Sequence, residues 1–330
     1  MGNLSKVILQ SSLAFLVAGS IYTGEIQDIS VKIDELRKSS PIIGINTELD
    51  TSQVDFKDIF GKAGKEQISD LEIYYIPLKN GEATLIKTDG KNILVNTGDK
   101  EDVKTLKSFI ENHEVNRIDH LIITLPTDEN MGGAPYLIDN ISVDKIYMPL
   151  VSLDNALVQN FFNVLKYKKQ KLTKIEKGDI LELGRAKIHI INVLNREPLN
   201  KTDASIAFML SLEENNFLFT GDLGKEKQKE IDWPDVNVLK IGNLGKDNFN
   251  SYELYKKSKP EYIIGTRTEE RNIDLNVENL IKTVESEERK DIEFRLSDLK
   301  NIIMLKSNGN EINMFEIPYL KEKNEEKTQN

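Results

Sequence analysis

The sequence has 330 residues, of which 30% are charged and 39% hydrophobic, and its formal net charge is −10 at pH 7. This length is sufficient for a large core, and the negative charge argues against nucleic-acid binding, because phosphates are normally neutralised by Lys and Arg. The sequence contains no cysteine, which excludes disulfides, thiolate catalysis and thiolate zinc sites.

Residues 1–24 have the pattern of an export segment. Lys6 precedes an apolar run from Val7 to Ala18, and the acidic residues Glu25 and Asp28 follow this run. A basic residue before such a run and acidic residues after it are typical of a signal peptide or a membrane anchor. We therefore predict an extracytoplasmic protein, membrane-anchored or secreted. An amphipathic helix on a cytoplasmic protein is the alternative.

Residues 25–65 are expected to form a helix and a linker. Four apolar residues at helical spacing share one stripe of the predicted helix: Ile26, Ile29, Ile33 and Leu36. This stripe could lie on the domain or on the bilayer. Alternatively, residues 26–36 could mediate self-association. From Ser39 to about Lys65 the pattern breaks up around Pro41 and several glycines, which favours a linker. At the other end of the chain, residues 319–330 are predicted to be a disordered charged tail.

The predicted main domain, residues 66–318, begins with strands. The segments "LEIYYIPL", "ATLIKT" and "NILVNTG" have the β-branched and aromatic residues of strands, and Asp89-Gly90 between the last two indicates a hairpin turn. Asp99 then caps a predicted helix with Leu106 and Phe109 on its apolar face. The apolar segment "IDHLIIT" follows and is predicted to be a strand buried on both sides.

The second half of the domain repeats this mixture. A helix is predicted from about Asp154 to Tyr167. Strands are predicted within "KGDILELGRAKIHIINV", "ASIAFMLSL", "NFLFTGD", "VNVLKIGNLG", "EYIIGT", "NIIMLKS" and "INMFEI". Strand groups interleaved with helices suggest two sheets covered by helices, although periodicity alone gives only an α/β or α+β class.

From about Leu71 to Ile317 the chain resembles the metallo-β-lactamase fold, and in detail the hydrolase-like domain of ComEC-type competence proteins. The segments that carry the resemblance are, in order, "NGEATLIKTDGKNILVNTGD", "RIDHLIITLPTDENMGG", "VDKIYMP", "KGDILELGRAKIHIINV", "NFLFTGDLGKE", "DVNVLKIGNLGKD" and "KPEYIIGT". The resemblance implies a four-layer αββα sandwich with a zinc site at the loop "TLPTDENMGG", residues 124–133.

The residues at the implied metal site depart from the family pattern. Where the family's first loop carries His-x-His-x-Asp-His, this chain has Leu125, Thr127, Glu129 and Asn130, with Asp128 among them. The family's Gly-His-His-Gly motif appears as Gly242-Asn243-Leu244-Gly245, and Asn96 stands where an aspartate is usual. Of the ligand positions, only Asp222 in "FTGDLG" matches a residue that can bridge two metals.

These substitutions predict a site without zinc chemistry. Zinc needs several imidazole, thiolate or carboxylate ligands, which leucine cannot replace, so we expect no catalytic residue and no cofactor. The alternative is Mg²⁺ or Mn²⁺ held by Asp128, Glu129, Asp203 and Asp222. If these residues hold no metal, their functions are structural: Asp128 and Glu129 hydrogen-bond to turn amides and solvent, and Asp222 caps the helix that follows. His113, His120 and His189 are expected to be surface or core histidines.

The sequence therefore predicts a non-catalytic protein of this fold, exported to the cell envelope. Glycines that keep the loop geometry are present while groups able to hold zinc are replaced, which favours a role in binding an envelope protein or a wall or membrane component. One alternative is a metal-dependent hydrolase, phosphodiesterase-like, that uses Mg²⁺ or Mn²⁺ at the acidic remnant. Another is a self-associating scaffold of an envelope assembly.

Overall fold

The computed structural model describes residues 70–151, 156–196, 198, 200–242, 251–266, 275–288, 291–298 and 301–318. Every described residue belongs to one compact unit, Gly64–Asn330. The predicted export segment of residues 1–24, the helix and linker of residues 25–65 and the tail of residues 319–330 lie outside the described residues, and so do Asn243, Leu244 and Gly245.

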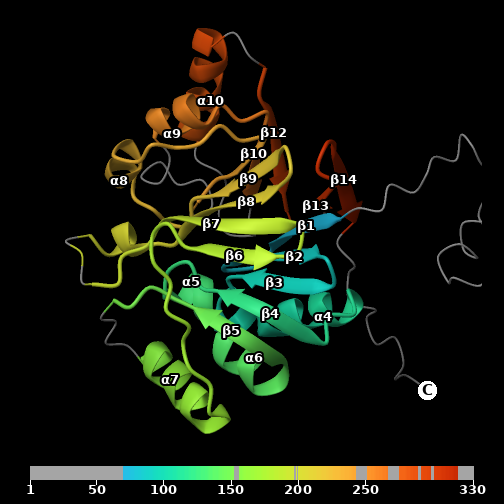
Figure 1. Cartoon of the computed structure of the whole chain (residues 1–330), viewed down its shortest axis with the longest axis vertical. Coiled ribbons are helices and arrows are strands. Elements are labelled where there is room, and N and C mark those ends of the chain that lie inside the picture. Colours follow the sequence, from blue (N-terminus) through green and yellow to red (C-terminus); the bar gives the residue numbers. More distant parts are fainter. Residues whose placement is uncertain are drawn as a thin grey trace, which may run out of the picture. The chain divides into compact units, whose positions relative to one another are not determined.

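The first sheet follows the order β14-β13-β1-β2-β3-β4-β5 (Figure 1). Its strands are β1 (Leu71–Pro77), β2 (Glu82–Thr88), β3 (Lys91–Val95), β4 (Arg117–Ile122), β5 (Ser142–Tyr147), β13 (Asn301–Ser307) and β14 (Ile312–Pro318). Pairing is antiparallel from β14 to β3 and parallel from β3 to β5. The hairpin between β2 and β3 turns at Asp89 and Gly90, as the sequence predicts.

The second sheet follows the order β12-β11-β10-β9-β8-β7-β6. Its strands are β6 (Ile180–Leu183), β7 (Ala186–Asn192), β8 (Ala207–Leu212), β9 (Asn215–Phe219), β10 (Val238–Lys240), β11 (Tyr262–Thr266) and β12 (Glu293–Ser297). The strands from β6 to β9 pair antiparallel, and those from β9 to β12 pair parallel. Each sheet thus contains a parallel part, whose strand ends can gather side chains at one edge.

Helices pack on the outer face of each sheet. Next to the first sheet lie α4 (Val103–Asn112), α5 (Asp128–Met131), α6 (Ala134–Asn140) and α7 (Ala156–Lys168), and next to the second lie α8 (Lys225–Lys229), α9 (Tyr252–Ser258) and α10 (Leu275–Glu288) (Figure 1). Two short 3₁₀ helices, η2 (Lys100–Asp102) and η3 (Lys201–Ala204), complete the elements used below. Asp99 accepts a hydrogen bond from the Glu101 amide at 2.9 Å and so caps η2. The N-cap of α4 itself is Asp102, so the predicted cap lies one 3₁₀ turn before the helix that carries Leu106 and Phe109.

Three apolar layers hold this arrangement together, because alternate residues of a strand face opposite sides of its sheet. In β1, Ile76 packs against α4, α6 and α7, while Ile73 packs between the two sheets. In β9, Phe217 faces the other sheet, and Leu218 packs under α9 and α10. The layers confirm the predicted four-layer αββα sandwich. In the described part of the chain, no helix is long and apolar enough to cross a membrane.

Candidate functional site

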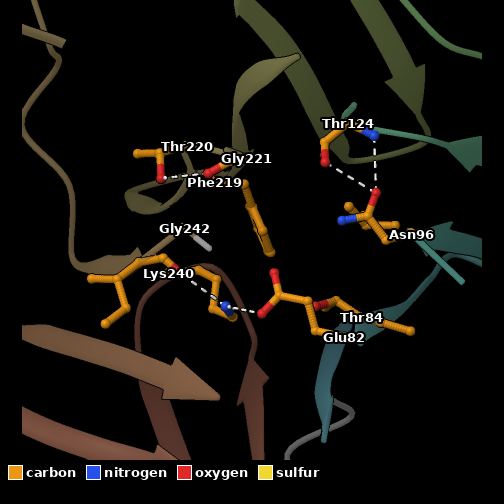
Figure 2. Close-up of a pocket in the computed structure, with 12 residues that line it drawn as sticks. Glu82, Thr84, Asn96, Thr124, Phe219, Thr220, Gly221, Lys240 and Gly242 are labelled. Atoms are coloured by element: carbon orange, nitrogen blue, oxygen red, sulfur yellow. Dashed lines mark hydrogen bonds and ion pairs between the residues drawn. The ribbon is translucent and has the colours of Figure 1, made fainter. Parts of the chain in front are cut away.

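A small cavity lies between the sheets where strands of both end. It is lined by Asn96 after β3, Thr124 after β4, Gly221 after β9 and Gly242 after β10, as well as by residues of β2 and β10 (Figure 2). Ligand sites in α/β proteins commonly form at such strand ends. The cavity volume is about 10 Å³, which is about the room that one water molecule needs. A substrate does not fit inside this cavity as it stands.

Asn96 is fixed at the centre of the site by its own backbone and side chain. Its φ of 59° is left-handed, a conformation that asparagine adopts more readily than most residues, and its amide donates to the Ile122 carbonyl at 2.9 Å. The carboxamide oxygen accepts from the Thr124 amide at 2.9 Å and from the Thr124 hydroxyl at 3.0 Å (Figure 2). The side-chain nitrogen of Asn96 therefore remains to donate elsewhere.

Asn130 accepts that hydrogen bond and donates another. Its Oδ1 accepts from Asn96 Nδ2 at 3.1 Å, and its Nδ2 donates to Asp222 Oδ2 at 2.6 Å. The opposite amide orientation would set two acceptor oxygens 2.6 Å apart, so the neighbours determine how Asn130 is turned. Since Asn130 follows β4 and Asp222 follows β9, this buried bridge joins the two sheets.

Asp222 is an acid whose charge is unfavourable in this position. The pKa of Asp222 is raised to about 6, first by burial and then by the charge of Glu82. The hydrogen bond from Asn130 lowers this pKa. Of the smaller effects, the charge of Glu129 raises it and that of Lys240 lowers it. The backbone amide of Asp222 donates to Ser205 Oγ at 2.9 Å. Asp222 does not cap the following helix, because the N-cap of α8 is Gly224, so the prediction of a cap at Asp222 is wrong.

A second polar contact between the sheets lies beside the first. Lys240, the last residue of β10, donates from Nζ to Glu82 Oε2 at 2.8 Å and to the carbonyl of Ile241 at 2.8 Å (Figure 2). Thr266, at the end of β11, donates its hydroxyl to the same Glu82 oxygen. The side chain of Lys240 is 5% exposed and that of Glu82 16%, so this is a largely buried ion pair.

Two of the predicted frame glycines are required by close backbone approach. A Cβ on Gly242 would lie 1.9 Å from the carbonyl oxygen of Gly221, which is closer than any real contact. Gly221 has a left-handed φ of 54°, and a Cβ there would lie 2.5 Å from Ser205 Oγ. These glycines let the loops after β9 and β10 pass each other, whatever the cavity holds.

The other predicted site residues lie around this bridge without forming a ligand set. Leu125 is buried at 4% exposure, and the Thr127 hydroxyl is buried without a hydrogen-bond partner among the described residues. Asp128 is exposed and Glu129 is half-buried on α5. Asn243 and Leu244 lie outside the described residues. The bridge thus unites Asn130 and Asp222, but it does not gather the remaining predicted positions.

The described donors do not fit a zinc centre of the kind that the resemblance implies. A zinc ion needs several oxygen or nitrogen lone pairs at about 2 Å. The carboxamide of Asn130 turns its hydrogens toward Asp222, so a metal on Asp222 would have to displace this hydrogen bond. Leu125 offers no lone pair. The described residues contain no group of three or more His, Asp or Glu side chains placed to hold a metal ion.

The acidic residues of the alternative magnesium or manganese site are placed differently from one another. The charges that raise the pKa of Asp222 come from Glu82 and Glu129, whereas those that act on Asp203 come from Lys227 and Glu230 beside α8. Burial is the first cause that raises the pKa of Asp203. Different side chains therefore act on the two carboxyl groups, although Ser205, two residues after Asp203, accepts the Asp222 amide through its Oγ.

The three histidines lie in different parts of the fold, and each has a local hydrogen-bond partner. His113 Nδ1 bonds the Phe109 carbonyl at 2.8 Å. His120 Nδ1 lies 3.1 Å from Tyr147 Oη, and His189 Nε2 lies 3.2 Å from Ser211 Oγ. No zinc site is formed by these side chains.

The ion pair of Lys240 and Glu82 is the part of the site that sequence reasoning missed. One signal for it was present: Lys240 is a single cation inside the apolar strand segment "VNVLKIG". Lysine is rarely buried unless it is paired, so a cation at this position indicates a buried acidic partner. The identity of the partner was not readable, because Glu82 lies 158 residues earlier in the chain.

Comparison with known proteins gives one curated relative and a set of similar folds. The chain is 21% identical over 165 residues to ComE operon protein 3 of Bacillus subtilis (strain 168), a match that covers 49% of this chain. It spans about a fifth of that relative's length, 21%. No family model matches the chain. This match agrees with the resemblance stated from the motifs.

Solved structures similar to this chain include the metallo-beta-lactamase fold protein YhfI from Bacillus subtilis, with a TM-score of 0.47 and 12% identity, covering 69% of this chain and 96% of that one. Another is CmlA, a diiron beta-hydroxylase from Streptomyces venezuelae, with a TM-score of 0.45 and 14% identity, covering 68% and 52%.

Proposed function

We propose that this chain is a non-catalytic protein of metallo-β-lactamase-like fold that acts by binding a protein or another component of the cell envelope. The observation that carries the proposal is the carboxamide of Asn130, which bridges Asn96 and Asp222 at the position where the resemblance implies metal ligands. A hydrolase of this kind needs an open coordination position for an activated water. Asn130 instead directs a hydrogen-bond donor toward Asp222, the carboxylate at the family's bridging position.

The surface around the cavity, rather than its interior, is the proposed binding region. The cavity has about 10 Å³ of space, and the charged groups beside it, Lys240 and Glu82, are already paired. On α5, Asp128 is exposed and Glu129 is half-buried, and the charge of Glu129 raises the pKa of Asp222. These acidic side chains favour a partner that presents basic groups, because opposite potentials steer association.

Metal content together with hydrolytic activity tests the non-catalytic part of the proposal. The full chain is purified from cells grown with excess zinc and manganese, its metal-to-protein ratio is measured by elemental analysis, and it is assayed on phosphodiester and ester substrates. We expect far less than one metal ion per chain and no chelator-sensitive turnover. Stoichiometric metal together with turnover that a chelator abolishes would instead favour the metal-dependent hydrolase.

An envelope location is the other part of the proposal. It is supported by the charge pattern of residues 1–24 and by the resemblance to ComEC-type competence proteins. Fractionation of cells that produce the full chain tests it, with a Leu13→Arg/Phe15→Arg variant that interrupts the apolar run. We expect the unaltered chain in the membrane or secreted fraction and the variant in the cytoplasm. An unaltered chain found only in the cytoplasm would contradict export.

A further inference from the structure

A second, larger groove opens toward the amino ends of the parallel strands of the first sheet. It has a volume of about 280 Å³ and is lined by residues of β3, β4, β5 and β6. His120 pairs with Ile93 of β3 and with Lys145 of β5, so the three residues share one face of the sheet. Lys91, two residues before Ile93, lies on the same face.

Each acidic side chain that lines this groove already has a cationic partner, although Asp119 and Asp144 share one. Asp119 lies 3.4 Å from Arg117 and also accepts the Asn92 amide at 2.9 Å, while Asp144 pairs with Arg117 as well. Glu182 pairs with Lys187 at 3.3 Å.

The two lysines that line the groove differ from these carboxylates in their ion pairing. Lys91 and Lys145 form no ion pair with any residue that the structure describes. Two cations on β3 and β5 are thus available to a ligand, one on each side of the strand that carries His120.

His120 places a third polar group between these cations. Its side chain is 6% exposed, its ring stacks on Tyr147 with centroids 5.8 Å apart, and its Nδ1 lies 3.1 Å from Tyr147 Oη. When the Tyr147 hydroxyl donates to Nδ1, the ring proton is on Nε2. The pKa of His120 is lowered to about 4, first by burial and then by the charge of Lys145. Of the smaller effects, Lys91 also lowers this pKa, whereas Asp119 and Asp144 raise it. The imidazole is therefore neutral at physiological pH, and in this tautomer its Nε2 is a hydrogen-bond donor.

We propose that this groove binds a small phosphate-bearing molecule, whose oxyanion contacts Lys91 and Lys145 and accepts a hydrogen bond from His120 Nε2. A phosphate group accepts hydrogen bonds from several directions and lysine binds it as a point charge, which suits donors on three adjacent strands. The wall formed by β6 adds apolar surface, since Ile180 is 49% exposed and Leu181 lines the groove. A compact organic group attached to the phosphate would pack against this wall.

Titration of the full chain with inorganic phosphate and with glycerol 3-phosphate tests the proposal. Isothermal calorimetry reports affinity, and ¹⁵N-histidine NMR reports the imidazoles, of which the sequence has three. We expect saturable binding at millimolar concentration, a shift of the His120 Nε2 resonance, and a higher pKa of His120 because the bound anion offsets the lysine charges. Lys91→Gln/Lys145→Gln should weaken binding about tenfold or more, since each charged hydrogen bond contributes strongly.

The matched control is Lys171→Gln/Lys177→Gln, which removes the same charge from exposed positions outside the groove. It should change the affinity less than about twofold, because distant surface charges are screened by salt. Absence of saturable binding, or an equal loss in both double variants, would overturn the proposal. Vesicles of phosphatidylglycerol form a further arm: retention that depends on Lys91 and Lys145 would support the same site and assign its phosphate to a lipid headgroup.

Discussion

The stability of the Asp222→Asn variant relative to the unaltered protein should increase as the pH rises. The folded-state pKa of Asp222 is about 6, against an ordinary value of 3.8. The folded state therefore holds the proton more tightly than the unfolded state, so the stabilisation is present below the unfolded value and is lost as pH rises through about 6. At about 1.36 kcal/mol for each unit of pKa, the ionised carboxylate costs roughly 3 kcal/mol at pH 8.

The asparagine variant removes this cost, because its amide oxygen can still accept from Asn130. We expect the free energy of unfolding of the variant to rise relative to the unaltered protein by about 2–3 kcal/mol between pH 4 and pH 8. Urea unfolding at each pH can be followed by the fluorescence of Trp233, the single tryptophan, which is buried against the second sheet. The exposed Asp128→Asn serves as the control and should stay within about 0.5 kcal/mol.

Two results would refute this reasoning about Asp222. A difference between variant and unaltered protein that does not change with pH would mean that the carboxyl group titrates normally. A variant that becomes relatively less stable as the pH rises would mean that the ionised carboxylate is stabilised in the folded protein. A cation bound at Asp222 would have that effect, so the second result would also count against the proposed non-catalytic site.

Three further substitutions test the rest of the site by urea or thermal unfolding. Asn130→Ala should lower the free energy of unfolding by about 2–4 kcal/mol at pH 8 and by less at pH 4, because the buried carboxylate loses its donor; an equal loss at both pH values would contradict this. Lys240→Met should cost about 3–5 kcal/mol by leaving Glu82 unpaired, and Lys240→Met/Glu82→Gln should recover most of it; simple additivity would argue against the pair. Gly242→Ala should cost more than about 2 kcal/mol, because its Cβ meets the Gly221 carbonyl, whereas Gly90→Ala, with open space around it, should cost about 1 kcal/mol.

The sequence predicts most of the fold because its apolar residues follow the period of each element. The alternation in β1 places Ile73 and Ile76 in different layers, and the Asp89-Gly90 turn fixes the hairpin between β2 and β3. The capping function of Asp99 is equally local. Such features depend on neighbours within a few residues, so the chain itself carries the information.

The polar contacts of the site depend on partners far apart in the chain. Asn130 and Asp222 are 92 residues apart, and their hydrogen bond forms only after two sheets pack together. The same is true of Lys240 and Glu82. Asp222 was misread as a helix cap because the residue type fits that function locally; the extended backbone of Gly224 places the cap two residues later. Residue type gave the list of candidates, whereas tertiary packing decided their partners.

The two contacts together explain how the loops can keep their arrangement without a shared metal ion. Asn130 links the sheets through Asp222, and Lys240 links them through Glu82, which lines the small cavity together with Lys240. The ammonium of Lys240 lowers the pKa of Asp222, so a cation supplied by the chain already acts on that carboxylate. This effect is the smallest of those acting on Asp222, whose pKa stays raised, and an ammonium group has no open coordination position at which to activate water. These two contacts are therefore the basis for proposing recognition of a partner rather than hydrolysis.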